Sequence, residues 1–147
     1  MVATVRQNLE SIEHAFEAYN SGDIDRYAQT YADPVVVVDA ATGERREEKR
    51  ADGIAGTRGF LDSFPDHQCT ILRLTAEDDR VVARYVNEAT HTGPGAFGEP
   101  TGVRAIWGAF SEYRFSDGIV VEVSTVSDVY SLVKQLGFSV TPPTSDI

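Results

Sequence analysis

The spacing of apolar residues changes near residue 68, and this change constrains the fold more than any other feature of the chain. After it, apolar and polar residues alternate, and residues 69–93 and 103–128 each predict two strands joined by a turn. The second turn contains "SDG", a tight hairpin signal. Before residue 68 the apolar residues follow helical spacing, at positions 5, 9, 12, 16 and 19. Helices followed by an antiparallel sheet predict an α+β domain whose curved sheet folds over the helices.

Shorter patterns predict the remaining elements. In chain order these are a helix over 24–32, a valine strand after Pro34, a charged and solvated loop over 42–53, a helix over 54–64 and a C-terminal helix over 128–137. A chain of 147 residues is long enough for one domain with an internal pocket. We expect that domain over residues 1–139 and a tail over 140–147.

Composition limits the partners and the location that we expect for the protein. The formal charge of −10 disfavours nucleic acid as a partner, because like charges repel. Cys69 is the single cysteine, so no intrachain disulfide can form, and this usage fits a reducing cytoplasm. The first 16 residues lack the pattern of a signal peptide, and no apolar run reaches transmembrane length. We therefore expect a soluble cytoplasmic protein with no membrane partner.

Asp39 follows four consecutive valines, a run that favours a strand buried on both faces. An ionised carboxylate out of water costs several kcal/mol unless it is paired, hydrogen-bonded or neutralised by a raised pKa. Asp39 is therefore a general base whose basicity is set by apolar surroundings, a strand-end turn cap, or part of a solvated loop.

Strand parity predicts which side chains face the interior, since successive residues point to opposite faces. The polar and aromatic side chains on the inward faces of strands 81–91 and 105–115 include Tyr85, Asn87, His91, Trp107, Ser111 and Tyr113. Each has a structural alternative: Ser111 and Asn87 can satisfy backbone groups, His91 can fix a loop, and the aromatic residues can be core. Their convergence nevertheless predicts an apolar pocket with a few polar groups.

A set of motifs, in order, resembles the SnoaL-like polyketide cyclases and the wider ketosteroid isomerase-like superfamily. The match covers residues 5–137 and includes "AFEAYNSGDID", "YADPVVVVD", "FPD", "THTGPGAFGEPTG", "YRFSDGIVVE" and "SDVYSLVKQLG". The resemblance implies a cone, in which a curved mixed sheet wraps round helices and encloses a deep apolar pocket. Function varies widely within this superfamily, so the fold alone does not fix the reaction.

The resemblance also implies roles for particular positions. Asp39 matches the general base of ketosteroid isomerase, and Ser111 falls where that isomerase has a protonated aspartic acid and the cyclase a histidine. Two positions depart from the cyclase pattern: Ser124 and Thr125 replace a tryptophan and the aspartate that serves as its acid/base. Ala15 replaces the isomerase's oxyanion tyrosine. Neither family's full set of catalytic residues is therefore present.

The leading hypothesis is a cyclase or isomerase that moves a proton on a small, apolar, oxygenated, polyketide-like substrate. Asp39 would act as the base, with Ser111 as hydroxyl donor and His91 as an inward histidine, while Tyr85, Asn87, Trp107, Tyr113 and Asp66 would contact the substrate. A second hypothesis pairs Asp39 with Asp66 for epoxide opening, as in polyether-forming members of the superfamily. Asp66 could instead only cap the "FPD" turn.

Other hypotheses need no catalytic carboxylate. The chain could be a non-catalytic binding or dimerisation module, or its pocket shape alone could fold a reactive substrate for cyclisation. No cofactor is expected, because the sequence has no Gly-rich phosphate loop and His14, His67 and His91 are not spaced as metal ligands. The resemblance implies a homodimer formed through the outward sheet face that carries Ile106, Gly108 and Phe110.

Overall fold

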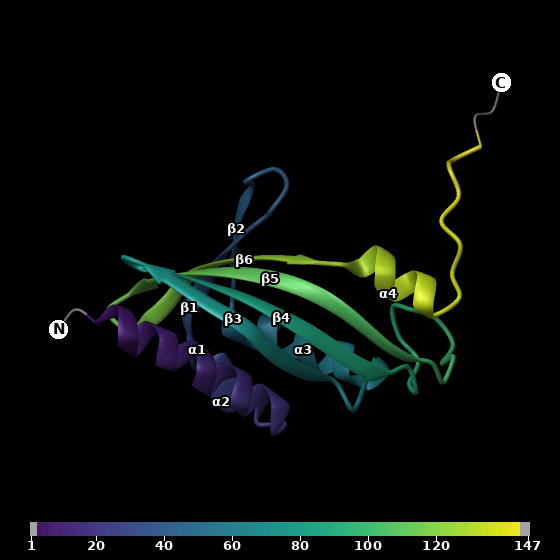
Figure 1. Ribbon diagram of the computed structural model, residues 1–147, viewed down its shortest axis with the longest axis horizontal. Coiled ribbons are helices and arrows are strands. Elements are labelled where there is room, and N and C mark those ends of the chain that lie inside the picture. Colours follow the sequence, from purple (N-terminus) through teal and green to yellow (C-terminus); the bar gives the residue numbers. More distant parts are fainter. Residues whose placement is uncertain (1–2, 145–147) are drawn as a thin grey trace.

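The computed structural model describes residues 3–144 as four helices and one six-stranded sheet (Figure 1). The helices are α1 (Val5–Asn20), α2 (Ile24–Ala28), α3 (Arg50–Ser63) and α4 (Val129–Gln135). The strands are β1 (Tyr31–Val38), β2 (Arg45–Glu48), β3 (Gln68–Glu77), β4 (Arg80–Thr90), β5 (Arg104–Ser116) and β6 (Ile119–Ser127).

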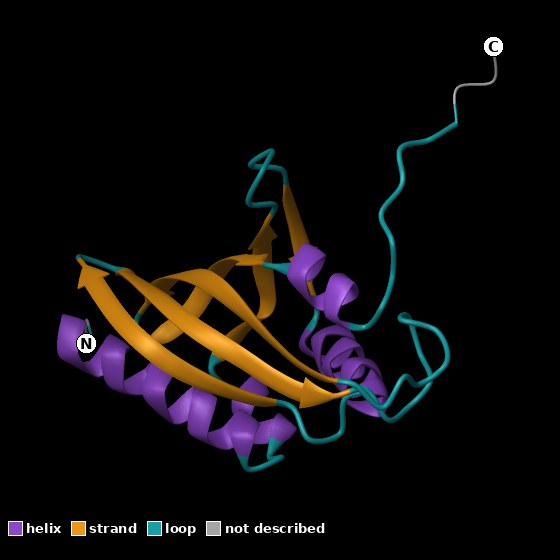
Figure 2. Ribbon diagram, turned by 45° about the vertical axis from the view of Figure 1, so that its right-hand side comes forward, coloured by secondary structure: helices purple, strands orange, loops and turns teal. Residues whose placement is uncertain are grey.

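The sheet is mixed and open, with strand order β2-β1-β6-β5-β4-β3. β1 runs parallel to β6, and every other neighbouring pair is antiparallel. The sheet curves strongly, and α1 and α2 lie along its inner side (Figures 1 and 2). This arrangement confirms the predicted α+β cone, and it places the inward side chains of β4 and β5 opposite the helices.

Helix α1 begins with a capping box. The Thr4 hydroxyl accepts from the backbone N–H of Gln7, and the Gln7 side chain accepts from the backbone N–H of Thr4. These two bonds satisfy donors that have no partner inside the helix. The buried face of α1, which includes Ile12 and Ala15, then packs under the sheet.

Two clusters of apolar side chains hold the layers together. The first lies between α1 and the middle of the sheet and includes Ile12, Val81 and Tyr113. The second lies under α4, where Leu132 and Leu136 pack on Phe64, Ala89, Ala105 and Trp107. Strand parity is confirmed: every inward residue of β5 from Ala105 to Phe115 is buried, and its outward neighbours are mostly exposed.

The segment expected to be a solvated loop instead contains strand β2. Its four charged residues pair with the valines of β1, from Val35 opposite Glu48 to Val38 opposite Arg45. Charged residues are common on edge strands because they discourage pairing with other chains. Helix α3 consequently begins at Arg50, four residues earlier than predicted, and its first N–H donates to Asp33 on β1.

The valine strand also differs from the prediction. β1 begins at Tyr31, before Pro34, and includes the cis Asp33–Pro34 bond. Helix α2 ends at Ala28, whereas the predicted helix ended at residue 32. Of the four valines only Val35 is buried, and the other three are half-buried. The prediction that the valine strand is buried on both faces is therefore wrong. β1 lies next to the edge strand β2, where the sheet extends beyond the apolar core.

The segment over 91–103 is docked tightly on the C-terminal end of α3. The Ser63 carbonyl accepts from the backbone N–H groups of Thr92 and Gly93, each at 3.1 Å. A Cβ at Gly93 would lie only 1.7 Å from the Asp62 carbonyl oxygen. Glycine at this position is therefore required by the close approach of two backbones.

Within residues 3–144, no helix combines the length and apolarity needed to cross a membrane. Residues 138–144 have no regular secondary structure and extend away from the sheet (Figure 1). The last part of the expected tail, residues 145–147, lies outside the described residues.

Two glycine substitutions should have opposite effects on stability. Gly93→Ala forces a Cβ into the Asp62 carbonyl, so the free energy of unfolding should fall by about 1–3 kcal/mol. Gly59→Ala lies in α3 with open space around its Cβ, so it should raise the same free energy by about 0.5–1 kcal/mol. Urea unfolding followed by circular dichroism measures both, and a neutral Gly93→Ala variant would contradict the close docking.

Candidate functional site

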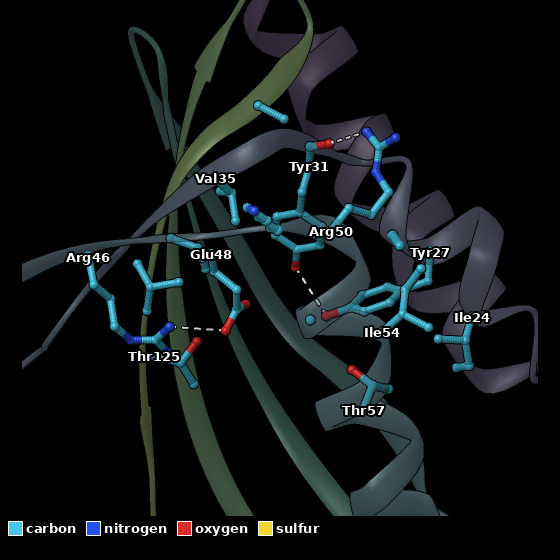
Figure 3. Close-up of a pocket in the computed structure, with 16 residues that line it drawn as sticks. Ile24, Tyr27, Tyr31, Val35, Arg46, Glu48, Arg50, Ile54, Thr57 and Thr125 are labelled. Atoms are coloured by element: carbon cyan, nitrogen blue, oxygen red, sulfur yellow. Dashed lines mark hydrogen bonds and ion pairs between the residues drawn. The ribbon is translucent and has the colours of Figure 1, made fainter.

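The inner side of the cone contains two adjoining cavities that share Tyr27, Thr57 and Thr125. The inner cavity, of about 370 Å³, is lined by Tyr19, Phe60, His67, Cys69, Tyr85 and Asn87, among others. The outer cavity, of about 210 Å³, is lined by Ile24, Val35, Arg46, Lys49, Arg50 and Ile54, among others (Figure 3). The predicted pocket is therefore present, and it extends from α1 to the β1–β2 edge.

Tyr19, His67 and Asn87 form a hydrogen-bonded chain on the wall of the inner cavity. The Asn87 Nδ2 donates to the Trp107 carbonyl at 3.4 Å, which turns Oδ1 toward His67 Nε2 at 3.0 Å and Cys69 Sγ at 3.3 Å. Since Oδ1 can only accept, Nε2 carries the imidazole proton. His67 Nδ1 is then the acceptor for the Tyr19 hydroxyl, which lies 2.5 Å away.

The surroundings of this chain keep it neutral. The His67 ring stacks on Trp107, with centroids 5.5 Å apart and planes 5° apart, and Phe60 meets it edge-on. Burial lowers the pKa of His67, although its hydrogen bond to Asn87 opposes the shift, and burial raises the pKa of Tyr19. At neutral pH the imidazole is therefore an uncharged base and the phenol an uncharged acid.

Ser111 is the centre of a second chain of hydroxyl groups. Its oxygen lies 2.9 Å from the Tyr85 hydroxyl and 2.7 Å from the Thr125 hydroxyl. Ser111 is buried behind these two residues, which themselves line the inner cavity. Burial raises the pKa of Tyr85 to about 12, so this chain supplies hydrogen-bond donors and not a base. Ser111 thus positions Tyr85 and Thr125, and it makes no lining contact itself.

The wall between the two cavities carries further phenols. The hydroxyls of Tyr27 and Tyr31 lie 3.1 Å apart, and burial raises the pKa of both. Figure 3 shows the two hydroxyls pointing toward each other. Tyr113, predicted to face the interior, lies beside Tyr31 and lines the inner cavity. Neutral hydroxyls of Tyr27, Tyr85 and Tyr113 therefore line the same cavity as Tyr19 and His67.

Asp39 does not lie in this interior. It is exposed in the turn after β1, where one carboxylate oxygen accepts from the backbone N–H of Ala41 at 2.9 Å and of Thr42 at 2.8 Å, and from the Thr42 hydroxyl. These bonds, led by the Thr42 N–H, lower the pKa of Asp39. The prediction of a buried base is wrong, and the turn cap is the correct alternative, because the hairpin needs an acceptor for its free N–H groups.

Asp66 is hydrogen-bonded to the end of β4. Its two oxygens accept from the backbone N–H and the hydroxyl of Thr90, at 2.7 and 2.8 Å, and the N–H bond is the main cause of a lowered pKa. Asp66 precedes the edge strand β3, whereas Asp39 follows β1 near the opposite edge. The expected carboxyl pair is therefore not formed, and neither acid lines the inner cavity.

His91 faces inward as predicted and is fully buried, but it lines neither cavity. Its Nδ1 accepts from the backbone N–H of Thr101 at 3.2 Å, and its ring stacks on Phe64 with centroids 5.1 Å apart. The backbone of His91 also bonds Gly102 and Val103. These contacts close the base of the segment over 91–103, so the structural alternative is correct for this residue.

Tyr19 and His67, which line the inner cavity, are not among the site residues predicted from the sequence. Spacing places Tyr19 on the helical face of Ile12 and Phe16, and His67 on the same parity as Cys69, but it carries no signal for the contact between the two residues. Among residues 3–144, no three His, Cys, Asp or Glu side chains converge in a way that would hold a metal ion.

Comparison with known proteins places this chain in a family. The sequence model of the family of SnoaL-like polyketide cyclases matches residues 11–136 of this chain. AclR of Streptomyces galilaeus, a candidate hydroxylase, is 30% identical, with a TM-score of 0.81, over 91% of this chain and 98% of its own.

Two further solved structures share the fold. IdmH of Streptomyces antibioticus, a candidate polyketide cyclase, is 27% identical over 90% of this chain and 99% of its own, with a TM-score of 0.77. A candidate SnoaL-like polyketide cyclase of Jannaschia sp. CCS1 is 19% identical over 96% and 97%, with a TM-score of 0.80. No curated protein sequence matches the chain. The family match over most of its length shows that this chain belongs to the SnoaL-like polyketide cyclases.

Proposed function

We propose that the protein catalyses a cofactor-independent proton transfer on a polyketide-like substrate held in the inner cavity, and that the reaction is a cyclisation or isomerisation. The observation that carries this proposal is the Tyr19–His67–Asn87 chain in apolar surroundings. A fixed tautomer and a neutral base are what proton abstraction next to a carbonyl requires. Asp39, in its exposed turn, has no part in it.

The proton moves through Tyr19. A substrate carbon next to a carbonyl gives its proton to the Tyr19 oxygen while the Tyr19 proton passes to His67 Nδ1. In a cyclisation, the resulting enolate carbon then bonds to a second carbonyl carbon, and the alkoxide formed there recovers a proton from His67 through Tyr19. In an isomerisation, the proton returns to a different carbon of the same enolate. In both cases the enzyme ends in its starting state.

The charges that form during this cycle have fixed partners. The imidazolium is stacked on the face of Trp107, which stabilises a cation, and its Nε2–H keeps Asn87 Oδ1 as acceptor. The substrate oxygen that becomes negative can accept from Tyr85 and Thr125, whose hydroxyls are linked through Ser111. Donors held in place before the reaction stabilise developing charge without reorganisation.

A non-catalytic binding module is the competing function. The hydroxyls of Ser111 and Thr125 stand where the resemblance places a histidine and an aspartate, and loss of those groups would suit a protein that only binds. The two functions differ in one respect: a binder keeps its ligand affinity and shows no rate that depends on His67.

Substitutions in the chain of three residues should separate these functions. Anthrone, a tricyclic ketone with an acidic methylene, exchanges its methylene protons in D₂O, and the rate is measured by mass spectrometry. We expect the protein to accelerate this exchange, and Tyr19→Phe or His67→Gln to lower the enzymatic rate about a hundredfold or more, the usual contribution of general acid–base catalysis. Asp39→Asn is the matched control and should stay within about twofold of wild type. An exchange rate that falls in Asp39→Asn and is unchanged in His67→Gln would contradict the proposal.

The exchange rate should also follow the titration of His67. Burial lowers the pKa of His67 from its ordinary 6.5, and only the neutral ring accepts the Tyr19 proton. The rate should therefore rise with pH through a pKa below that value and be level at neutral pH. A profile of kcat/KM from about pH 4.5 to 8 measures this. A rate that falls as pH rises through this range would contradict a neutral histidine base.

We also propose that the outer sheet face pairs with a second copy of the chain. Ile106, Phe110 and Val126 are each more than half exposed there, and Phe110 lies directly opposite Val126. Contiguous exposed apolar side chains of this kind mark interfaces. Sedimentation velocity should show a dimer for wild type and a monomer for Phe110→Glu. Val5→Glu, on α1, is the control and should leave the dimer intact; a wild-type monomer would refute the pairing.

A further inference from the structure

We propose that the outer cavity binds an ionised carboxylate of the substrate through Lys49 and Arg50, so that the protein selects a polyketide-like acid over its neutral ester. This inference rests on the proposed function only in assuming that the substrate occupies the cavities. It concerns charged residues at the β2–α3 junction, which have no role in the proton transfer.

The charges around the outer cavity do not balance. Three cationic side chains line it, from Arg46, Lys49 and Arg50, against one carboxylate, from Glu48. Arg46 Nη1 lies 3.1 Å from Glu48 Oε1, so these two residues neutralise each other (Figure 3). Within residues 3–144, neither the Lys49 nor the Arg50 side chain has a carboxylate at ion-pair distance. This excess is notable in a chain of formal charge −10.

The Arg50 guanidinium is fixed in position yet incompletely bonded. Its Nη2 donates to the Tyr31 carbonyl at 2.9 Å, which holds the side chain against the start of β1 (Figure 3). Its Nε is buried and has no acceptor among the described residues. The nearby carboxylate of Asp33 accepts from the backbone N–H of Arg50 and leaves Nε unbonded. A buried donor without a partner is costly, so a bound carboxylate that drew the guanidinium toward the cavity and accepted from Nε would remove that cost.

The position of these cations also fits the rest of the site. The outer cavity has apolar walls from Ile24, Val35 and Ile54, and it adjoins the inner cavity at Tyr27, Thr57 and Thr125. A carboxylate at Lys49 and Arg50 would therefore leave the rings of the same molecule directed toward Tyr19 and His67. An ester at this place would lose the charge-assisted hydrogen bond and leave both cations unmatched.

Binding of 9,10-anthraquinone-2-carboxylate and of its methyl ester tests the inference. Trp107 is the single tryptophan and stacks on His67, so quenching of its fluorescence reports occupancy of the inner cavity. At neutral pH the acid should bind about tenfold more tightly than the ester or better, the gain expected of one charge-assisted hydrogen bond. Its affinity should fall with added salt, and that of the ester should not.

Two variants and one control complete the test. Arg50→Gln and Lys49→Met should each bring the acid close to the ester in affinity and leave ester binding unchanged. Lys49 is exposed, so its variant keeps the test valid if loss of the Tyr31 contact unfolds Arg50→Gln. Lys134→Met removes the same charge from α4, where Lys134 lies over Tyr130, and should preserve the preference for the acid.

The outcomes separate this inference from the proposed function. Equal affinity for acid and ester, or a preference that survives Lys49→Met, overturns the carboxylate site while the effect of His67→Gln on proton exchange still stands. Failure of both probes to bind, together with absent exchange, overturns the occupied cavity and the carboxylate site together.

Discussion

The hydrogen bond from His67 Nε2 to Asn87 Oδ1 is the interaction on which the site depends. It places the imidazole proton on Nε2 and so makes Nδ1 the acceptor that faces Tyr19. Asn87 can do this because its own amide nitrogen is held by the Trp107 carbonyl on the neighbouring strand. The register of β4 and β5 therefore fixes the protonation pattern of a histidine that belongs to neither strand, and a shift of one residue would remove it.

The surroundings of His67 and Asp39 are the reason that we propose a histidine, and not a carboxylate, as the base. Asp39 has its pKa lowered by turn hydrogen bonds in full contact with water, which makes it a weaker base than an ordinary aspartate. His67 is neutral because burial opposes its protonation. The hydroxyls of Ser111 and Thr125 lie 2.7 Å apart in the sheet. Near neutral pH a hydroxyl donates or accepts hydrogen bonds but does not act as a base. In the proposed reaction, the base and the hydrogen-bond donors would thus lie on different walls of one cavity.

The sequence predicted the features that depend on local periodicity. Alternation placed Asn87, Trp107 and Ser111 on the inward face, and the structure confirms this. Prediction failed where distant groups decide: the start of α3 is set by Asp33 on β1, and β2 forms because the valines of β1 need a partner. Asp39 was misplaced because the valine run indicates a strand but does not show where that strand leaves the core. The Tyr19–His67 contact joins residues 48 positions apart, which no local pattern reveals.

Arginine, lysine and glutamate side chains line the outer cavity, and the proposed proton transfer takes place in the inner one. This arrangement suits the proposed chemistry. A carboxylate bound beside His67 would stabilise the imidazolium, raise the pKa of that histidine and consume the base before any proton left the substrate. Holding the carboxylate at Lys49 and Arg50, beyond the phenols of Tyr27 and Tyr31, avoids this. The permanent charges then lie where the cavity meets the β1–β2 edge, and the inner cavity carries charge only while the proton is in transit. An acid substrate and a neutral histidine base would be compatible in this protein because they would occupy different cavities of one site.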